Sequence, residues 1–269
     1  NAIVNGVSIW YEDSGGDDKV PGVFSHGLLL NGRMFEPQVE ALKDRYRCIR
    51  YDHRGQGRSS SDPGWRPHDI ENLYRDAINF LETTDLRPVH WVGFSTGGFV
   101  GMRLAARRPD LVSSLTLLDT SAEAETHAAR AQYQRLTWAA LALGPKRLVN
   151  RIMPVLFGKS FLTDPTRAAE VARWREEIAA NSRMVVRAVW GVLERESVLD
   201  ELREISTPTL VVVGEEDVAT VPTKSRRIHA SIHGSVLVRL PRCGHSSSIE
   251  QPAEVSRLLR EFLDGIRVR

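Results

Sequence analysis

Short apolar runs of strand length recur along the chain and are separated by longer segments with helical periodicity. The runs lie at residues 20–25, 48–51, 89–94, 115–118, 210–213 and 236–240, and Gly, Pro, Asp or His bounds each of them. Their apolar residues are continuous and do not alternate with polar ones, which is typical of parallel strands buried on both faces. The pattern therefore predicts a sheet that is covered on both sides.

Four segments have the spacing of amphipathic helices, namely residues 36–44, 70–83, 97–107 and 252–266. Helices that alternate with buried strands predict the α/β class, with a doubly wound parallel sheet. At the start of the chain, Asn5-Gly6 predicts a tight hairpin turn because both residues tolerate positive φ angles. A strand over residues 8–11 is expected to follow this turn.

The alternation stops between residues 121 and 206, where helical signals dominate. They cover residues 128–143, 147–156, 167–180 and 184–193, and the strand pattern resumes at Thr209. A helical block between two strands of one sheet is typical of a lid inserted into a domain. We therefore expect a core formed by residues 1–120 and 207–269 and a lid formed by residues 121–206.

Composition narrows the possible partners. The 269 residues include 36 Lys and Arg against 34 Asp and Glu, a balance that favours neither nucleic acid nor a membrane surface as partner. No apolar stretch approaches the ~18 residues of a membrane span, and residues 1–10 lack the features of a signal peptide, so a cytoplasmic protein is expected. Cys48 and Cys243 are expected to be reduced thiols, and their spacing predicts no metal site.

The segment Gly93-Phe94-Ser95-Thr96-Gly97-Gly98 lies between a predicted strand and a predicted helix. It matches the G-x-S-x-G nucleophile elbow, in which a serine occupies a sharp, strained turn. The flanking glycines allow strand and helix to approach closely, and the start of the helix favours developing negative charge. Ser95 is thus the predicted nucleophile.

A serine hydroxyl needs a base to act as a nucleophile at neutral pH. His245 is the preferred base because it follows a predicted strand and Gly244 near the end of the chain. His26 also follows a strand but belongs to His26-Gly27, and His90 begins a strand and is expected to be structural. The remaining histidines lie in predicted loops or on the surface, at His53, His68, His127, His229 and His233.

The base in turn needs a carboxylate that orients it. Asp217 follows the strand at residues 210–213, and the chain order Ser95, Asp217, His245 is that of serine hydrolases with a nucleophile elbow. Glu215 and Glu216 are close alternatives, and Asp119 is a more distant one.

A tetrahedral intermediate also needs two backbone N–H groups that face its oxyanion. One is expected from Thr96, the residue after the nucleophile. The other is expected from Leu28, in the loop that follows the strand at residues 20–25.

These residues resemble the α/β-hydrolase family over essentially the whole chain. The similar segments are His26-Gly27-Leu28, Tyr51 to Ser59, Gly93 to Gly98, Gly214 to Asp217 and Gly244-His245. The resemblance implies the α/β-hydrolase fold, with a mostly parallel, twisted, eight-stranded sheet flanked by helices. It implies a structural turn for the D-x-R-G-x-G-x-S segment at residues 52–59. A departure is Leu28-Leu29-Leu30, where many relatives have a second glycine or a proline.

The similar members are small, cofactor-free esterases, lactone hydrolases and haloperoxidase-type perhydrolases with a helical lid. The resemblance therefore implies a serine hydrolase that cleaves a small, largely apolar ester or lactone through an acyl-enzyme, without cofactor or metal. A slowly hydrolysing butenolide receptor, a perhydrolase and a carbon–carbon bond hydrolase stay open, as does a lid arginine for a substrate carboxylate. The expected substrate-binding residues are Leu29, Phe94, Trp138, Met153, Phe157, Trp190 and Val218.

Overall fold

Seven strands form the central sheet of the computed structural model, which describes residues 1–64 and 68–266. Their order is β3-β5-β4-β6-β7-β8-β9, with β3 antiparallel to β5 and every other neighbouring pair parallel. The predicted mostly parallel sheet is therefore confirmed. The strands are β3 (Tyr11–Asp13), β4 (Pro21–Ser25), β5 (Arg47–Tyr51), β6 (Val89–Phe94), β7 (Val112–Leu118), β8 (Thr209–Gly214) and β9 (Val236–Leu240).

The predicted count of eight strands in this sheet is wrong. The hairpin at Asn5-Gly6 forms as predicted, but its strands β1 (Ala2–Val4) and β2 (Val7–Ile9) pair only with each other among the described residues. The expected strand over residues 8–11 is interrupted at Trp10. Its N–H donates to Ser59 Oγ (2.9 Å) and its carbonyl accepts from Asp52 N–H (3.0 Å), so β3 starts afresh beyond it.

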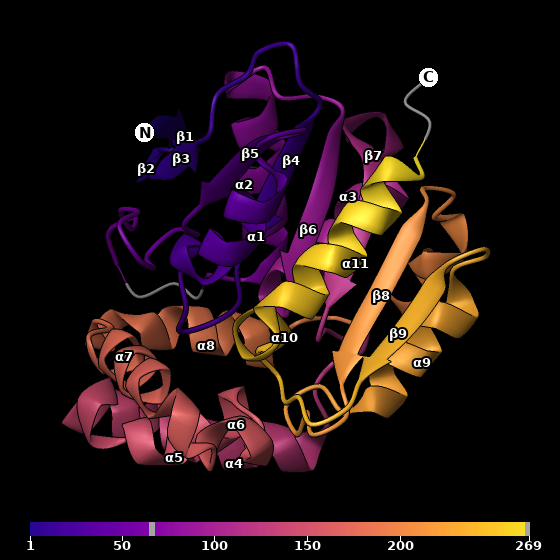
Figure 1. Cartoon of the computed structure of the whole chain (residues 1–269). Helices are drawn as coiled ribbons and strands as arrows, with labels where there is room; N and C mark the ends of the chain where they lie inside the picture. The colour runs from indigo at the N-terminus through magenta and orange to yellow at the C-terminus, as the bar shows by residue number, and fades with distance from the viewer. Residues whose placement is uncertain (65–67, 267–269) are drawn as a thin grey trace.

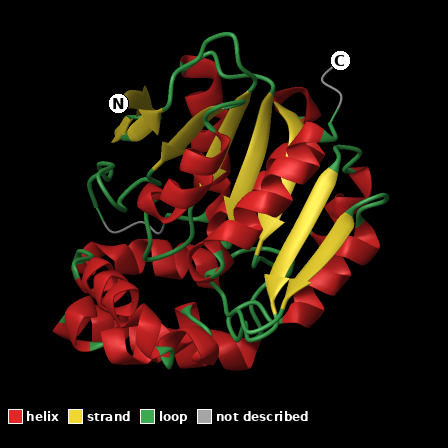
Figure 2. Ribbon diagram, viewed as in Figure 1, coloured by secondary structure: helices red, strands yellow, loops and turns green. Residues whose placement is uncertain are grey.

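Helices cover both faces of the sheet (Figure 2). One face carries α1 (Glu36–Leu42) and α11 (Pro252–Asp264), and the other carries α2 (Ile70–Thr83), α3 (Thr96–Arg107) and α9 (Pro222–Ser231). Side chains alternate between these layers along each strand. In β6, Trp91 packs with the α2 and α3 residues, whereas Val92 and Phe94 belong to the cluster that contains α11. The covered faces explain why the strands read as continuous apolar runs.

Five α-helices are inserted between β7 and β8: α4 (His127–Leu143), α5 (Val149–Leu156), α6 (Lys159–Leu162), α7 (Ala168–Ala179) and α8 (Val186–Leu193). Figure 1 shows them gathered beyond the carboxyl ends of the strands. Four of the five begin and end within a few residues of the helical segments expected there, and α6 was not expected. Among residues 1–64 and 68–266, no helix reaches the length and hydropathy that a bilayer-spanning segment requires.

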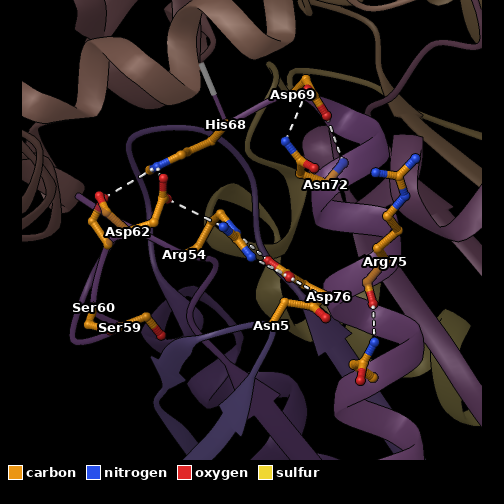
Figure 3. Close-up of polar contacts among 12 residues, drawn as sticks. Asn5, Arg54, Ser59, Ser60, Asp62, His68, Asp69, Asn72, Arg75 and Asp76 are labelled. Atoms are coloured by element: carbon orange, nitrogen blue, oxygen red, sulfur yellow. Dashed lines mark hydrogen bonds and ion pairs between the residues drawn. The ribbon is translucent and has the colours of Figure 1, made fainter. Parts of the chain in front are cut away.

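A polar network joins the loop after β5 to α2 and α8. Figure 3 shows its Arg54, Asp62, His68 and Asp76 side chains. Asp62 Oδ2 accepts from Arg187 Nη2 of α8 at 2.8 Å, and Asp62 Oδ1 lies 3.3 Å from Arg54 Nη1 and 3.2 Å from His68 Nε2. Arg54 also pairs with the buried Asp76 of α2. The network fixes one end of the inserted helices to the sheet.

Candidate active site

Ser95 occupies a strained turn between β6 and α3. Its backbone has φ 48° and ψ −108°, a conformation that costs a non-glycine residue energy and persists only when its surroundings impose it. Two glycines impose it by close packing. A Cβ on Gly93 would lie 2.3 Å from the Gly97 carbonyl oxygen, and one on Gly97 would lie 2.0 Å from that of Ser25.

The three side chains predicted as nucleophile, base and acid form one hydrogen-bonded chain. Ser95 Oγ lies 3.1 Å from His245 Nε2, and His245 Nδ1 lies 2.9 Å from Asp217 Oδ2. Asp217 is itself held as an acceptor by the Ala219 and Thr220 N–H groups at 2.8 and 2.9 Å and by the Thr220 hydroxyl at 2.7 Å. The geometry therefore orients the imidazole with Nδ1 toward the carboxylate and Nε2 toward the serine.

The interaction between His245 and Asp217 raises the pKa of the imidazole and lowers the pKa of the carboxyl group. Burial disfavours the imidazolium of His245, but the charge of Asp217 and its hydrogen bond outweigh burial and raise the pKa of His245. Burial also disfavours the carboxylate of Asp217, yet the same partner and the hydrogen bonds from Thr220 lower the pKa of Asp217. The site thus stabilises a positive charge on the imidazole.

The rival carboxylates make other contacts. Asp119 accepts from the N–H groups of Gly214 (2.9 Å) and Ser247 (3.2 Å), and burial, with Asp217 nearby, raises its pKa. Glu215 pairs with Arg239 at 2.9 Å. Glu216 is hydrogen-bonded to Ser160 of α6. The Asp217 carboxylate is the one of these four that is hydrogen-bonded to His245.

Two backbone donors near Ser95 are available to a ligand. The N–H groups of Leu28 and Thr96 make no hydrogen bond within the described part of the chain. The loop of Leu28 lies close because Gly27 has no side chain: a Cβ there would be 2.4 Å from the ring of Phe94. His26 orders the same loop, because its Nε2 accepts from the His53 N–H at 2.8 Å.

The inserted segment 156–167 is bonded to the loops that carry His245 and Asp217. Glu250, at the end of the short helix α10 (Ser247–Glu250), accepts from the N–H groups of Gly158, Gly244 and Ser246 at 3.1, 2.8 and 3.0 Å. The Ser246 hydroxyl donates to the Leu156 carbonyl at 2.7 Å. The Ser160–Glu216 contact makes the corresponding link to the Asp217 loop. Sequence reasoning missed Glu250, because no motif or periodicity distinguishes it from other helix carboxylates.

A cavity of about 170 Å³ lies between the inserted helices and the sheet, with Ser95 and His245 in its wall. Most of the wall is apolar. On α4 it is formed by Tyr133, Leu136, Thr137 and Ala140, whose i, i+3, i+4, i+7 spacing is one helical face. This spacing is visible in the sequence and could have identified the residues of α4 that face the cavity, but the prediction did not use it.

Leu29 lines this cavity as predicted, whereas the six other expected substrate-binding residues do not. Phe94 packs beneath the His245 ring, 5.0 Å between centroids. Trp138 is 58% exposed and packs edge-on against Trp190. The prediction favoured large side chains, but helix geometry turns Trp138 about 100° away from Thr137. Met153 and Phe157 are buried in the core, and Val218 is 60% exposed.

Other groups with nucleophilic or metal-binding potential are not part of this hydrogen-bonded chain. Cys48 and Cys243 are buried and unpaired, and burial raises the pKa of the Cys48 thiol to about 12. Ser114 is bonded to His90, but burial lowers the pKa of this imidazole to about 4. The described residues hold no group of three or more His, Cys, Asp and Glu that could bind a metal ion.

A serine at a strand–helix elbow, bonded to a histidine and through it to an aspartate above a parallel sheet, defines the α/β-hydrolase class of site. The chain belongs to the alpha/beta hydrolase fold family, whose profile matches residues 23–252.

Relatives extend over nearly the whole chain. A protein of Variovorax paradoxus provisionally named carbamate hydrolase RutD is 31% identical, over 94% of this chain and 95% of its own length. The crystal structure of an enol-lactonase from Burkholderia xenovorans superposes with a TM-score of 0.89 at 26% identity, covering 98% of this chain and 99% of that one. An esterase from Thermogutta terrifontis gives 0.89 at 28% identity, with coverages of 97% and 95%.

Proposed function

We propose that the protein is a serine hydrolase that cleaves a small, largely apolar carboxylic ester or lactone. The observation that carries the proposal is the continuous chain of hydrogen bonds from Ser95 through His245 to Asp217 in the wall of an apolar cavity. The similar enol-lactonase and esterase structures support this substrate class. Residues 121–206 then serve as a lid over the core of residues 1–120 and 207–269.

The proposed reaction has two steps. His245 removes the proton from Ser95 Oγ as this oxygen attacks the carbonyl carbon, and the free N–H groups of Leu28 and Thr96 stabilise the oxyanion. His245 then gives the proton to the leaving alkoxide, whose departure produces the acyl-enzyme. In the second step His245 activates a water molecule that releases the acid. Asp217 stabilises the imidazolium in both steps.

Covalent labelling tests the proposed nucleophile. A fluorophosphonate should modify Ser95 stoichiometrically, because the activated oxygen attacks phosphorus while Leu28 and Thr96 bind the phosphoryl oxygen. Mass spectrometry of the digested protein identifies the modified serine. Ser114 serves as an internal control, since it also contacts an imidazole but lies in the core. A label at another serine, or none at Ser95, would contradict the proposal, and labelling without ester turnover would indicate a binding protein.

The pH dependence follows from the raised pKa of His245. Only the neutral imidazole can accept the serine proton, so kcat/KM for 4-nitrophenyl butyrate should fall as the pH drops through this pKa. Because the pKa is raised, the midpoint of the acid limb should lie above the ordinary value of 6.5. The profile is measured with the free enzyme at constant ionic strength. A midpoint below 6.5 would show that the Asp217 charge does not control the base.

A further inference from the structure

Most of the cavity wall is apolar. Glu125, Arg195 and Tyr133 are among its polar residues, in addition to Ser95 and His245. Arg195 lies over the ring of Phe99 in α3, 4.5 Å from the ring centroid. The Tyr133 hydroxyl is close enough to Glu125 and Asp217 that burial, together with both charges, raises its pKa. We call these three residues the polar wall.

The ion pair in the polar wall is largely buried, and its carboxylate has a second cation nearby, because Lys224 Nζ lies 3.7 Å from Glu125 Oε1. Arg195 Nη2 lies 3.2 Å from Glu125 Oε2, and the two side chains are 3% and 12% exposed. Arg195 also donates to the carbonyls of Glu123 and Val192, which hold its guanidinium in place. Buried pairs contribute little to stability compared with apolar packing. Stability alone therefore gives no reason for an ion pair in an otherwise apolar wall.

Tyr133 supplies the unsatisfied group of the polar wall. Its hydroxyl makes no hydrogen bond to any described residue, although the side chain is half-buried. By contrast, the hydroxyl of Thr137, one turn further along α4, donates to the Tyr133 carbonyl at 2.8 Å. A phenol can both donate and accept, so this hydroxyl in the cavity wall can bind either a carbonyl or a hydroxyl oxygen.

We propose that the polar wall binds an uncharged oxygen group of the substrate, a carbonyl or a hydroxyl, at a distance from the scissile bond. This inference rests on the proposed hydrolase function and names its substrate class more closely. The Tyr133 hydroxyl donates to that oxygen, and Glu125 accepts from it where it is a hydroxyl. A carboxylate is disfavoured beside the Tyr133 hydroxyl, because the negative charges of Glu125 and Asp217 act on that hydroxyl and would repel it.

Arg151 is the remaining charged residue of the cavity wall. Its side chain is exposed, so solvent screens its charge. Like Tyr133, it also lines a second hollow between α4 and α5. The alternative to the polar wall is that Arg151 binds a carboxylate of the substrate. In that case the protein would prefer a negatively charged ester over an uncharged one.

The test compares substrates of matched length in two series. In the first, 4-nitrophenyl esters carry pentanoate, 4-oxopentanoate or hydrogen succinate as the acyl group. In the second, butyrate is esterified with pentanol or with 2-ethoxyethanol, and hydrolysis is followed by titration of the released acid. The wild type should prefer the neutral oxygen-containing ester in one series and hydrolyse the succinate ester least.

Tyr133→Phe should lower that preference about two- to tenfold, which corresponds to the roughly 0.5–1.5 kcal/mol of one hydrogen bond. Tyr74→Phe is the matched control, a half-buried tyrosine on α2 away from the cavity, and it should change no ratio. Glu125→Gln removes a negative charge from the polar wall. It should therefore raise kcat/KM for the succinate ester relative to the pentanoate ester.

Unchanged ratios in both series with Tyr133→Phe would overturn the polar wall, as would a wild-type preference for the succinate ester. Either result leaves the hydrolase proposal intact as long as the plain esters are hydrolysed through Ser95. Absence of turnover for every ester would instead refute the proposed function itself.

Discussion

Ser95→Ala should lower kcat for 4-nitrophenyl butyrate on the order of 10⁶-fold, the loss found when a triad serine is removed from other enzymes. The substitution removes the oxygen that forms the acyl-enzyme and leaves His245 without its partner at 3.1 Å. It also replaces a side chain in a strained backbone with a smaller one, so the fold should persist. Initial rates of 4-nitrophenol release, with circular dichroism as a folding check, measure the effect.

Ser114→Ala is the matched control for this prediction. Ser114 is buried and its Oγ lies 2.8 Å from His90 Nδ1, so the substitution removes a similar serine–histidine contact from the core. It should cost some stability and leave kcat within a few-fold of the wild type. Equal losses in the two variants would mean that stability, and not nucleophilic attack, explains the effect at Ser95.

Asp217→Asn should lower kcat on the order of 10⁴-fold, by analogy with the serine-protease triad. An amide at this position would donate to His245 Nδ1, which favours the wrong tautomer, and it would no longer stabilise the imidazolium. The Thr220 contacts keep the side chain in place, so KM should change little. Steady-state kinetics at several pH values separate these effects, because the acid limb should also move to lower pH.

Asp200→Asn is the control, since this residue is exposed on the surface away from the cavity. Asp119→Asn serves as a comparison because Asp119 is buried and was the alternative candidate for the carboxylate that orients His245. If Asp217→Asn had a negligible effect and Asp119→Asn a large one, the orienting carboxylate would be Asp119.

Much of the fold was predictable because burial on both faces leaves a strong signal. The limits expected for β6 and α2 agree with the structure, since their apolar residues have the period of a covered strand and of an amphipathic helix. The helix α9 was not predicted. Its segment is rich in Lys, Arg and Ser and buries only Ser225 and Ile228, too few positions to show a period.

The site, like the fold, was predictable only in part. Ser95, Asp217 and His245 follow strands, and a parallel sheet brings the carboxyl ends of its strands to one edge, so their proximity could be inferred. The cavity wall depends instead on the rotation of each inserted helix about its axis. That rotation is set by packing against the core, which is why Trp138 was expected in the wall although it faces solvent.

The bonding of residues 156–167 to the catalytic loops has a consequence for how such a protein diversifies. Substitutions in this segment disturb Glu250 or Glu216 and, through them, the loops of His245 and Asp217. Among the described residues, the cavity-facing side chains of α4 and of Val189, Val192 and Leu193 on α8 make no hydrogen bond to those loops. Changes of specificity can therefore accumulate in α4 and α8 at little cost to chemistry, whereas residues 156–167 are constrained together with the triad.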